Sequence, residues 1–349
     1  MIYHKAVKGD TPAKIAHQYH ADLETFYRLN QCRPSDYIVP GENYIIARTK
    51  NASSEHINNC SFEYGWRELE KDSRTLSGQV NKFEIGRSAC HLPIYGFSIG
   101  DGPRKLFISA VWHGNEWLNG WLLMKFLIAL DIKSRRRESW LGYDVNSILK
   151  SNTIATVPLV NPDGAELVQE GVHEENPYYN SILEINGGMN LFHHWSANAR
   201  GVDLNHQWPA GWKEESRTSP QRPFPRHYGG EAPLTEPEAK TVYTFSMEQE
   251  FDMVLALHSQ GEEIYWGYNG FEPVESLRIA EKLAAASSYH LVKNAGSGAG
   301  YKDWFIKTFR RPGFTVETGI GQNPLPFSQS DRIWLFAVPL LLQFCSEPQ

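Results

Sequence analysis

Two absences set the first limits on this chain of 349 residues. It lacks the uninterrupted run of roughly 18 apolar residues that a membrane-spanning helix needs. The most apolar segment, residues 117–132, contains Asn119, Lys125 and Asp131, so we expect a buried helix there. The N-terminal residues also lack the charged start, apolar core and cleavage site of a signal peptide. We therefore expect a cytoplasmic protein, with association with a spore or cell wall as the alternative.

Cysteine is scarce, and charge of one sign does not dominate. The four cysteines, at positions 32, 60, 90 and 345, form no CxxC pair, which argues against a cysteine zinc site. The net charge of −6 lacks the basic excess of nucleic-acid-binding proteins. A hydrophobic content of 41% and a charged content of 21% are ordinary for a globular protein. We expect neither a nucleic-acid nor a membrane partner.

The first 50 residues form a pattern of their own. A short strand over residues 3–7 is followed by helices over 12–19 and 23–29 and by a last strand over 44–47. Asp10 or Thr11 is the expected N-cap of the first helix, because Pro12 suits the first helical position. The sequence thus predicts a small βααβ domain over residues 1–50. A polar linker over 51–60 follows, and then one large domain over 61–349.

The short N-terminal segment resembles a LysM domain. The matching residues span nearly all of it: Lys8-Gly9-Asp10-Thr11, Ile15-Ala16, Leu29-Asn30 and Pro40-Gly41. LysM domains bind glycans that contain N-acetylglucosamine, such as peptidoglycan and chitin, so the resemblance implies a glycan partner. The same residues would be needed to build the fold in any case, so they leave open whether the glycan groove is intact.

Apolar strand candidates alternate with helical patterns in residues 61–349. The strand candidates are residues 106–112, 153–160, 253–257 and 314–316, and the helical patterns are residues 117–132, 237–250 and 273–290. This alternation predicts an α/β fold: a mixed, mostly parallel sheet with helices on both faces. Sites in such sheets form beyond the carboxyl ends of the strands.

Three ionisable residues, His113, His258 and Glu317, stand at such strand ends. His113 and Glu116 are three residues apart at a strand-to-helix corner, where their side chains can meet one metal ion. Imidazole nitrogen and carboxylate oxygen are good zinc donors, and His258 supplies a third. Three protein ligands leave a position for water, which is typical of a catalytic zinc site. Glu317 is then the candidate general base.

Each of these residues has an ordinary explanation when it is taken alone. A single histidine such as His258 is usually a hydrogen-bonded core residue. Glu116 would favour a helix N-terminus through the helix dipole, and Glu317 could support a ligand instead of acting as a base. The joint occurrence at equivalent strand ends is what predicts one zinc ion per chain.

A series of motifs follows in order along the large domain: His113-Gly-Asn-Glu116, Asn161-Pro-Asp-Gly164, Gly201-Val-Asp-Leu-Asn205, His258-Ser259, Asp303-Trp304 and Phe314-Thr-Val-Glu317. This ordered set resembles the zinc carboxypeptidases of the M14 family across nearly all of residues 61–349. The resemblance implies a zinc carboxypeptidase-like fold. It also implies that His113, Glu116 and His258 bind zinc and that Glu317 is the base.

The resemblance breaks down where that family binds the terminal carboxylate of its substrate. The family follows the Asp-Leu-Asn motif with an arginine, a residue suited to holding a carboxylate through two hydrogen bonds. Here Asn205 is followed by His206. A second family arginine has no clear equivalent, although Arg200 lies nearby, and the family's tyrosine is absent, with Tyr301 close by. We predict that these four residues bind substrate, and we doubt ordinary removal of a C-terminal amino acid.

The combination of a LysM-like segment with an altered carboxypeptidase-like domain looks like the γ-D-glutamyl-L-diamino acid endopeptidases. Those enzymes cleave the γ-D-Glu–diaminopimelate bond of peptidoglycan stem peptides, so peptidoglycan or muropeptides are the expected partners. Glu262 and Glu263 could pair with the ammonium group of a diamino acid, although a solvated loop is the simpler expectation.

Three other functions stay open on the sequence. The first is a metallocarboxypeptidase that removes C-terminal amino acids. The second is a peptidoglycan-binding protein with an inactive peptidase fold. Hydrolysis of an N-acyl amino acid is a more distant alternative.

Overall fold

The computed structural model describes residues 2–34, 36–47, 63–294 and 296–347. The predicted linker over 51–60 therefore lies outside the described residues. Within the described part, no helix has the length and apolar character needed to cross a membrane. The cysteines at positions 32, 90 and 345 are free thiols.

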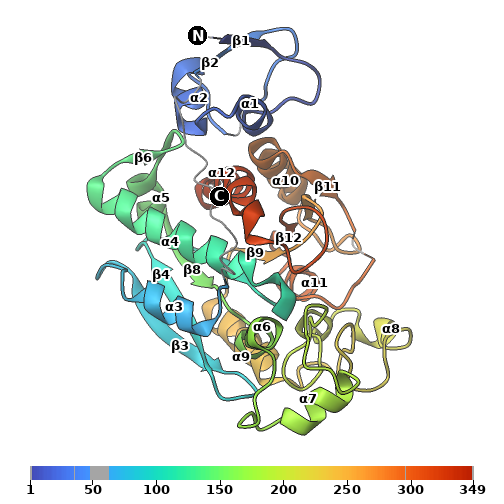
Figure 1. The fold of residues 1–349 in the computed structure, drawn as a ribbon. Coiled ribbons are helices and arrows are strands. Elements are labelled where there is room, and N and C mark those ends of the chain that lie inside the picture. Colours follow the sequence, from blue (N-terminus) through green and yellow to red (C-terminus); the bar gives the residue numbers. More distant parts are fainter. Residues whose placement is uncertain (1, 35, 48–62, 295, 348–349) are drawn as a thin grey trace.

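A mixed eight-stranded sheet runs through the large domain (Figure 1). Its strands, in spatial order, are β11 (His290–Val292), β10 (Glu263–Tyr265), β12 (Gly313–Glu317), β9 (Met253–His258), β5 (Arg104–Ala110), β8 (Asn152–Val157), β4 (Pro93–Ile99) and β3 (Asn81–Arg87). The four central strands, β12, β9, β5 and β8, are parallel to one another. Toward the edges, β10 runs antiparallel to β12, and β4 and β3 add an antiparallel pair.

Helices cover both faces of this sheet, as the sequence predicts. Successive residues of β5 point to opposite faces, so Leu106 and Ile108 belong to one apolar cluster and Phe107 to the other. The first cluster is closed by α4 (Leu118–Arg136), α10 (Glu275–Ser287) and α12 (Ser330–Ser346). The second is closed by α9 (Pro237–Gln249) and α11 (Tyr301–Phe309). Both faces are buried, which explains why the central strands are continuously apolar.

The remaining elements are shorter. They are α3 (Trp66–Ser73), β6 (Ser139–Trp140), β7 (Tyr143–Asp144), α5 (Val145–Ser151), α6 (Pro162–Glu170), α7 (Tyr179–Ile185), α8 (Trp212–Glu215) and the 3-10 turns η1 (Gly114–Glu116), η2 (Leu204–His206) and η3 (Phe327–Gln329). All four predicted strands and all three predicted helices of the large domain are present, with shifted ends. The strands β3, β4, β10 and β11 were not predicted. β3 and β11 are half-exposed strands at the two edges of the sheet, and β10 and β11 have only three residues each, so these strands lack a long apolar run.

The N-terminal segment folds as β1 (Ile2–Lys5), α1 (Pro12–Tyr19), α2 (Leu23–Asn30) and β2 (Asn43–Ile46), the order predicted from the sequence. Thr11 is the N-cap of α1, because its hydroxyl accepts a hydrogen bond from the Lys14 amide (3.2 Å). Asp10, the other candidate, instead accepts a hydrogen bond from the His4 ring (2.7 Å).

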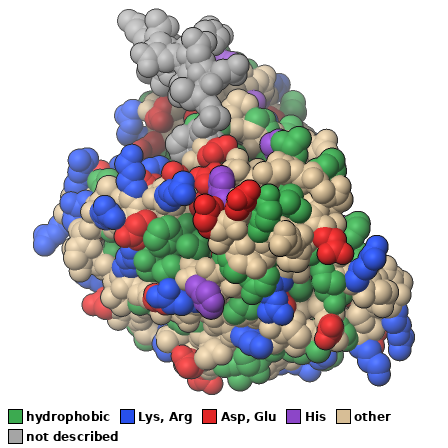
Figure 2. All heavy atoms as spheres, turned by 60° about the horizontal axis from the view of Figure 1, so that its bottom comes forward, with side chains coloured by type: hydrophobic (Ala, Val, Ile, Leu, Met, Phe, Trp, Pro, Cys, Tyr) green, Lys and Arg blue, Asp and Glu red, His purple; other side chains and the backbone are tan. Residues whose placement is uncertain are grey.

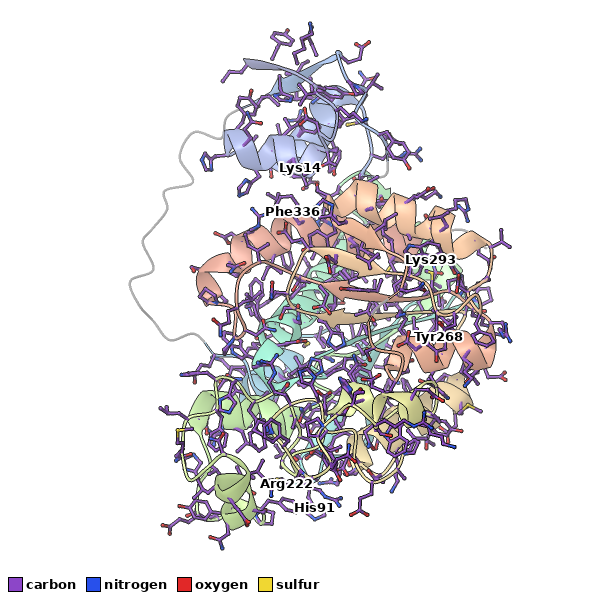
Figure 3. All side chains as sticks on the ribbon, turned by 90° about the vertical axis from the view of Figure 1, so that its right-hand side faces the viewer. Lys14, His91, Arg222, Tyr268, Lys293 and Phe336 are labelled. Carbon is purple, nitrogen blue, oxygen red and sulfur yellow. The ribbon has the colours of Figure 1, made fainter. Side chains whose placement is uncertain are left out.

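This N-terminal unit lies against the large domain, beside α10 and α12 (Figure 1). The ring of His17 on α1 packs against Phe336 on α12, with centroids 5.8 Å apart. Lys14 and Phe336 mark the two sides of this interface in Figure 3. The Thr11 hydroxyl also contacts the hydroxyl of Ser288 at the end of α10. On the face of the large domain that lies away from the N-terminal unit, acidic and basic side chains are interspersed (Figure 2).

Two buried carboxyl groups lie side by side where α6 and α9 begin. Asp163 accepts hydrogen bonds from the Ser88 hydroxyl (2.7 Å) and the Cys90 amide (2.8 Å), and Glu238 accepts one from the Ala89 amide (2.8 Å). Burial, together with the charge of Asp163, raises the pKa of Glu238 from 4.5 to about 8. At neutral pH, Glu238 therefore carries a proton in the folded chain and none in the unfolded chain.

We expect this proton to make folding stability fall as pH rises. A group with a raised folded pKa stabilises the fold fully below its unfolded pKa, here 4.5, and loses that contribution up to about pH 8. Replacing Glu238 with glutamine should make this fall shallower, measured as the melting temperature across that interval. Glu248→Gln, at an exposed position of the same helix, should keep the wild-type slope. An unchanged slope in Glu238→Gln would contradict the assignment.

Candidate metal centre

The register of the parallel strands brings the candidate residues to one edge of the sheet. His258 is the last residue of β9 and pairs directly with Glu317, the last residue of β12. On the other side of β9, Leu257 pairs with Ala110, the last residue of β5. His113 follows three residues after that end, so all three candidates meet at the carboxyl edge.

A tight corner after β5 aims His113 at this edge. Val111 has a φ of 55°, a left-handed conformation that is rare and costly for a β-branched residue. Gly114 follows, and a side chain there would lie 2.4 Å from the carbonyl oxygen of Gly164. The glycine of the His-Gly-Asn-Glu motif is therefore required by the close approach of two backbones.

Asn161 ties this corner to its neighbours. Its amide nitrogen donates to the carbonyl groups of Trp112 (3.2 Å) and Ala197 (3.0 Å), and its oxygen accepts from the Gly164 amide (2.9 Å). The side chain is completely buried, so these bonds form away from water. The Asn-Pro-Asp-Gly motif thus fixes the loop that carries the candidate ligands.

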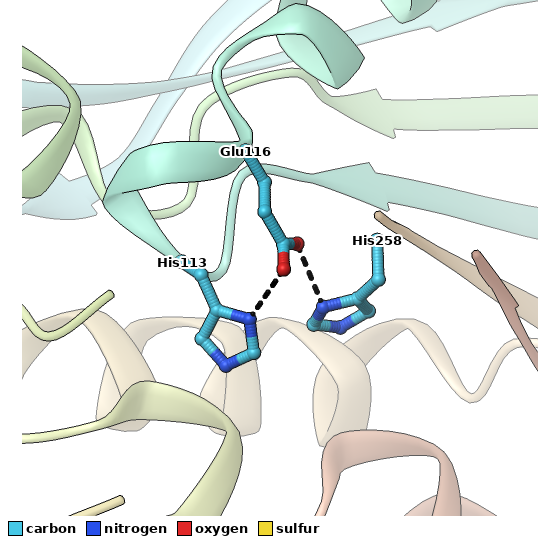
Figure 4. A group of neighbouring side chains, drawn as sticks. All are labelled: His113, Glu116 and His258. Atoms are coloured by element: carbon cyan, nitrogen blue, oxygen red, sulfur yellow. Dashed lines mark hydrogen bonds and ion pairs between the residues drawn. The ribbon is translucent and has the colours of Figure 1, made fainter. Parts of the chain in front are cut away.

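The three predicted ligands lie together in the structure (Figure 4). His113 Nδ1 is 2.9 Å from Glu116 Oε1, and His258 Nδ1 is 3.0 Å from Glu116 Oε2. One ligand atom from each residue lies within 4.8 Å of the other two. Burial alone would raise the pKa of Glu116, but the two imidazoles hold that pKa down to about 2, so Glu116 is ionised.

The donor set fits a zinc ion. Nε2 of His113 lies 3.1 Å from Asp203 Oδ1, a contact that fixes the ring and leaves Nδ1 to face Glu116. A carboxylate behind a histidine is the usual support of a metal-binding imidazole. Nδ1 of His258 faces the carboxylate of Glu116, while the buried Nε2 of His258 has no partner among the described residues. Two imidazoles and one carboxylate form a common catalytic zinc set.

Glu317 stands next to these residues without being one of their hydrogen-bond partners. Burial and the negative charges of Glu116 and Glu263 raise the pKa of Glu317 well above its usual value. Glu263 is its cross-strand neighbour on β10. A carboxyl group with a raised pKa beside a metal set is suited to accept and return a proton.

The solvated loop expected at Glu262 and Glu263 is wrong. Glu263 lies in β10, and its carboxylate accepts a hydrogen bond from the hydroxyl of Tyr265 (2.6 Å). Both oxygens of Glu262 accept hydrogen bonds from Arg332 on α12 (2.8 and 2.9 Å). The short strand β10 pairs Glu263 with β12, and both glutamates are partly buried. A strand of three residues has too short an apolar pattern to be recognised in the sequence.

The prediction that Tyr301 contacts substrate is also wrong. Its ring is completely buried among the aromatic residues between α11 and the sheet, stacked on Trp112 with centroids 5.1 Å apart. Its hydroxyl lies 3.0 Å from the hydroxyl of Ser246 on α9. The residue belongs to the core because it lies on the face of α11 that packs on the sheet.

Asn205 and His206 lie beside the metal set, in the turn η2 that follows Asp203. The Asn205 side chain accepts a hydrogen bond from the backbone amide of Tyr301 (3.2 Å), so it connects η2 to the start of α11. His206 is 15% exposed, and its Nδ1 contacts the carboxylate of Glu215 on α8. Burial alone would lower the pKa of His206, but Asp203 and Glu215 raise it above its ordinary value.

Arg200 points elsewhere. Its side chain is 45% exposed and lies 3.6 Å from Glu236 Oε2, ahead of α9. No contact between Arg200 and the three predicted ligands occurs among the described residues. A role for this residue in substrate binding therefore stays a prediction.

The sequence did not single out three residues that the structure places at the site. Asp203 supports His113, and Glu215 holds His206. The Asn323 amide donates to the Ser259 carbonyl (2.7 Å) and reaches Glu116 Oε1 (3.4 Å). The sequence did offer a signal for Asp203, because this residue belongs to the Gly201-Val-Asp-Leu-Asn205 motif. Glu215, at the end of the short helix α8, and Asn323, in a loop, had none, because neither belongs to a motif that the sequence reveals.

The fold and the site together define a class of protein. An α/β sheet carries two imidazoles and a carboxylate at its carboxyl edge, with a free glutamate beside them, which is the arrangement of a zinc-dependent hydrolase. The family model described as zinc carboxypeptidase, Peptidase_M14, matches residues 67–335. The chain therefore belongs to the zinc carboxypeptidase family of metallopeptidases, and its membership implies a zinc ion.

Curated relatives and solved structures agree with this family. The chain is 42% identical over 258 residues to "Gamma-D-glutamyl-L-diamino acid endopeptidase 1" of Lysinibacillus sphaericus, which covers 74% of this chain and 65% of the relative. It is 36% identical over 285 residues to "Uncharacterized protein YqgT" of Bacillus subtilis, which covers 77% of this chain and 76% of that protein. The chain thus spans less than two thirds of the endopeptidase.

The crystal structure of thrombin activatable fibrinolysis inhibitor has a similar fold, with a TM-score of 0.63 and 18% sequence identity. The match covers 80% of this chain and 72% of the other. At this identity the likeness concerns the fold alone, an α/β sheet flanked by helices.

We expect Asp203→Asn to weaken zinc binding by about 10- to 100-fold, because the amide supports His113 less well than a carboxylate does. The measurement is competition for zinc against a chelating indicator. Asp131→Asn is the matched control: this carboxylate is equally buried but bonds to Ser77, far from the ligands. Equal zinc affinity in Asp203→Asn and the wild type would show that Asp203 does not support the ligand.

Proposed function

We propose that the chain hydrolyses the γ-D-glutamyl–diaminopimelate amide bond of peptidoglycan stem peptides. His113, Glu116 and His258 would hold the zinc ion. When bound, zinc polarises a carbonyl group and makes water a stronger acid, which prepares an amide for hydrolysis. The observation that carries this proposal is Glu317 at the end of β12, paired in register with His258 and next to the ligand set.

Glu317 acts as the general base in this proposal. Its carboxylate takes a proton from the attacking water and passes it to the leaving amine. The nearby carboxylates that raise its pKa make it a stronger base than an ordinary glutamate. Glu116 cannot take this part, because both of its oxygens face the two imidazoles.

The environment of His206 supports a peptidoglycan peptide over an ordinary C-terminal peptide. A flat guanidinium at this position would hold a terminal carboxylate through two parallel hydrogen bonds. The imidazole of His206 offers fewer donors, and Glu215 already occupies its Nδ1. The likeness to a γ-D-glutamyl-L-diamino acid endopeptidase supports the same substrate class.

The test is hydrolysis of L-Ala-γ-D-Glu-meso-diaminopimelate by the purified full chain. We expect release of L-Ala-D-Glu and diaminopimelate, which is lost on chelation and restored by added zinc. Glu317→Gln should lose about 10²-fold or more of the rate because the base is removed, while it keeps its zinc content. Retained activity in this variant would contradict the role of Glu317.

A control variant and two alternative substrates show whether the hydrolysis depends on Glu317 and on the stem peptide. Glu263→Gln alters the cross-strand neighbour of Glu317 and leaves the base in place, so hydrolysis should persist. Ordinary peptides, with a free or an amidated C-terminus, separate the alternatives. Cleavage of free-ended peptides alone would identify a metallocarboxypeptidase. A chain that binds zinc but cleaves neither substrate would favour a binding protein with an inactive peptidase fold.

We propose in addition that the N-terminal unit is a LysM domain that binds glycans with N-acetylglucosamine. Its βααβ order supports this proposal, as do exposed side chains suited to packing on a sugar: Tyr37 is 68% exposed and Val39 is 53% exposed. Binding to the glycan would raise the local concentration of stem peptides at the peptidase site. In a cytoplasmic location the accessible substrates would be soluble muropeptides.

We expect Tyr37→Ala to reduce retention of the chain on insoluble peptidoglycan severalfold, because it removes an exposed aromatic ring from the segment between α2 and β2. The measurement is a sedimentation assay with zinc removed, so that hydrolysis does not release the chain. Leu277→Ala, at an exposed position on α10, is the control and should bind like the wild type. Equal retention of the two variants would count against a glycan site at Tyr37.

A further inference from the structure

We propose that Asp203, His206 and His227 form a second binding site for a divalent transition-metal ion, beside the predicted zinc ligands. One ligand atom from each lies within 4.8 Å of the other two. Asp203 Oδ2 is 3.8 Å from His206 Nε2 and 4.0 Å from His227 Nδ1. Imidazole and carboxylate are ligands that Zn²⁺ and Co²⁺ readily accept.

His206 is oriented like a metal ligand. Its Nδ1 forms an ion pair with the Glu215 carboxylate, whose negative charge favours a proton on Nδ1 and leaves Nε2 facing Asp203. His113 has a similar arrangement with the two ring nitrogens exchanged: its Nε2 contacts the carboxylate of Asp203, and its Nδ1 faces Glu116. A carboxylate behind the far nitrogen fixes the tautomer of a metal-binding histidine.

Glu215 is held firmly enough to orient His206. Its carboxylate accepts hydrogen bonds from the Ser297 hydroxyl (2.9 Å) and from the amides of Gly298 (2.9 Å) and Ala299 (3.1 Å). Its side chain is 16% exposed, although it belongs to a short surface helix. The charge of Glu215 is therefore fixed at one side of the His206 ring.

His227 is brought to the cluster by its backbone. Its N–H donates to Asp203 Oδ2 (3.0 Å), and its φ of 65° is a left-handed conformation uncommon outside glycine. The ring lies edge-on to His206, with centroids 5.4 Å apart. The side chain is 59% exposed, so a metal ion held here would keep positions open to water or to a substrate.

The charges and distances of the cluster suit a cation. Asp203 and Glu215 place two carboxylates around two imidazoles. Two ligands at tetrahedral angles around zinc, with bonds of about 2.1 Å, are about 3.4 Å apart. The observed 3.8 and 4.0 Å therefore need a contraction of about half an ångström, within the reach of a partly exposed ring. We expect weaker binding here than at the first site, where the donors are closer.

The second ion would restore positive charge where the zinc carboxypeptidases carry an arginine. His206 occupies that position, directly after Asn205. An ion with open positions could accept a carboxylate of the substrate in place of the missing guanidinium. This consequence rests on the proposed function, whereas the site itself does not.

The experiment counts zinc ions per chain without any substrate. Metal-free protein is dialysed against a series of zinc concentrations, and bound metal is measured by atomic absorption. We expect two ions on the wild type, the second bound at least about tenfold more weakly. His227→Asn and His206→Asn should each keep one ion. His193→Asn, which changes an exposed histidine outside the cluster, should keep two.

Cobalt gives an independent reading of the same site. A second equivalent of Co²⁺ should add visible absorption bands to the wild type and to His193→Asn, and none to His227→Asn. Melting temperatures check that each variant is folded, and His227 is exposed enough for substitution to be tolerated. One ion on the wild type, or two ions on both cluster variants, would overturn the proposal. Neither result bears on whether the chain cleaves stem peptides.

Discussion

The parallel register of β5, β9 and β12 is the constraint on which the rest of the site depends. It sets the ends of three strands level, so that His258 pairs with Glu317 and lies next to the corner that carries His113. Residues more than 200 positions apart in the sequence thereby meet at one edge. Asn161 then holds the corner in place from the neighbouring loop, away from water. Without this alignment of strand ends, His113 and Glu116 would not lie beside His258 and Glu317.

The candidate metal centre concentrates negative charge, and this charge explains why histidines surround its carboxylates. Glu116, Asp203 and Glu317 are gathered where water is scarce, and burying such groups without partners is costly. The histidines supply the compensation: His113 and His258 face Glu116, while His113 and His206 flank Asp203. A zinc ion bound among the first three would offset the same charge. The proposed second ion would do so around Asp203.

Sequence reasoning succeeded where a simple geometric rule applied. Residues just beyond apolar strands must reach the carboxyl edge, so His113, His258 and Glu317 could be named without coordinates. It failed at Tyr301, because proximity in the chain to a motif does not tell which face of α11 packs on the sheet. It also failed at Glu263, because a three-residue strand has too little pattern to be distinguished from a loop.

The sequence by itself determined the elements, the α/β class and the candidate zinc ligands, because apolar periodicity and the positions after strands are local properties. Only the tertiary structure decided which carboxylate supports which imidazole. Asp203, His227 and Asn323 come from loops, and Glu215 comes from the four-residue helix α8. Packing, rather than any repeating pattern, sets the positions of these segments. Hydrogen bonds of about 3 Å require side chains to be placed within a fraction of an ångström. That accuracy arises only when distant segments are folded against each other.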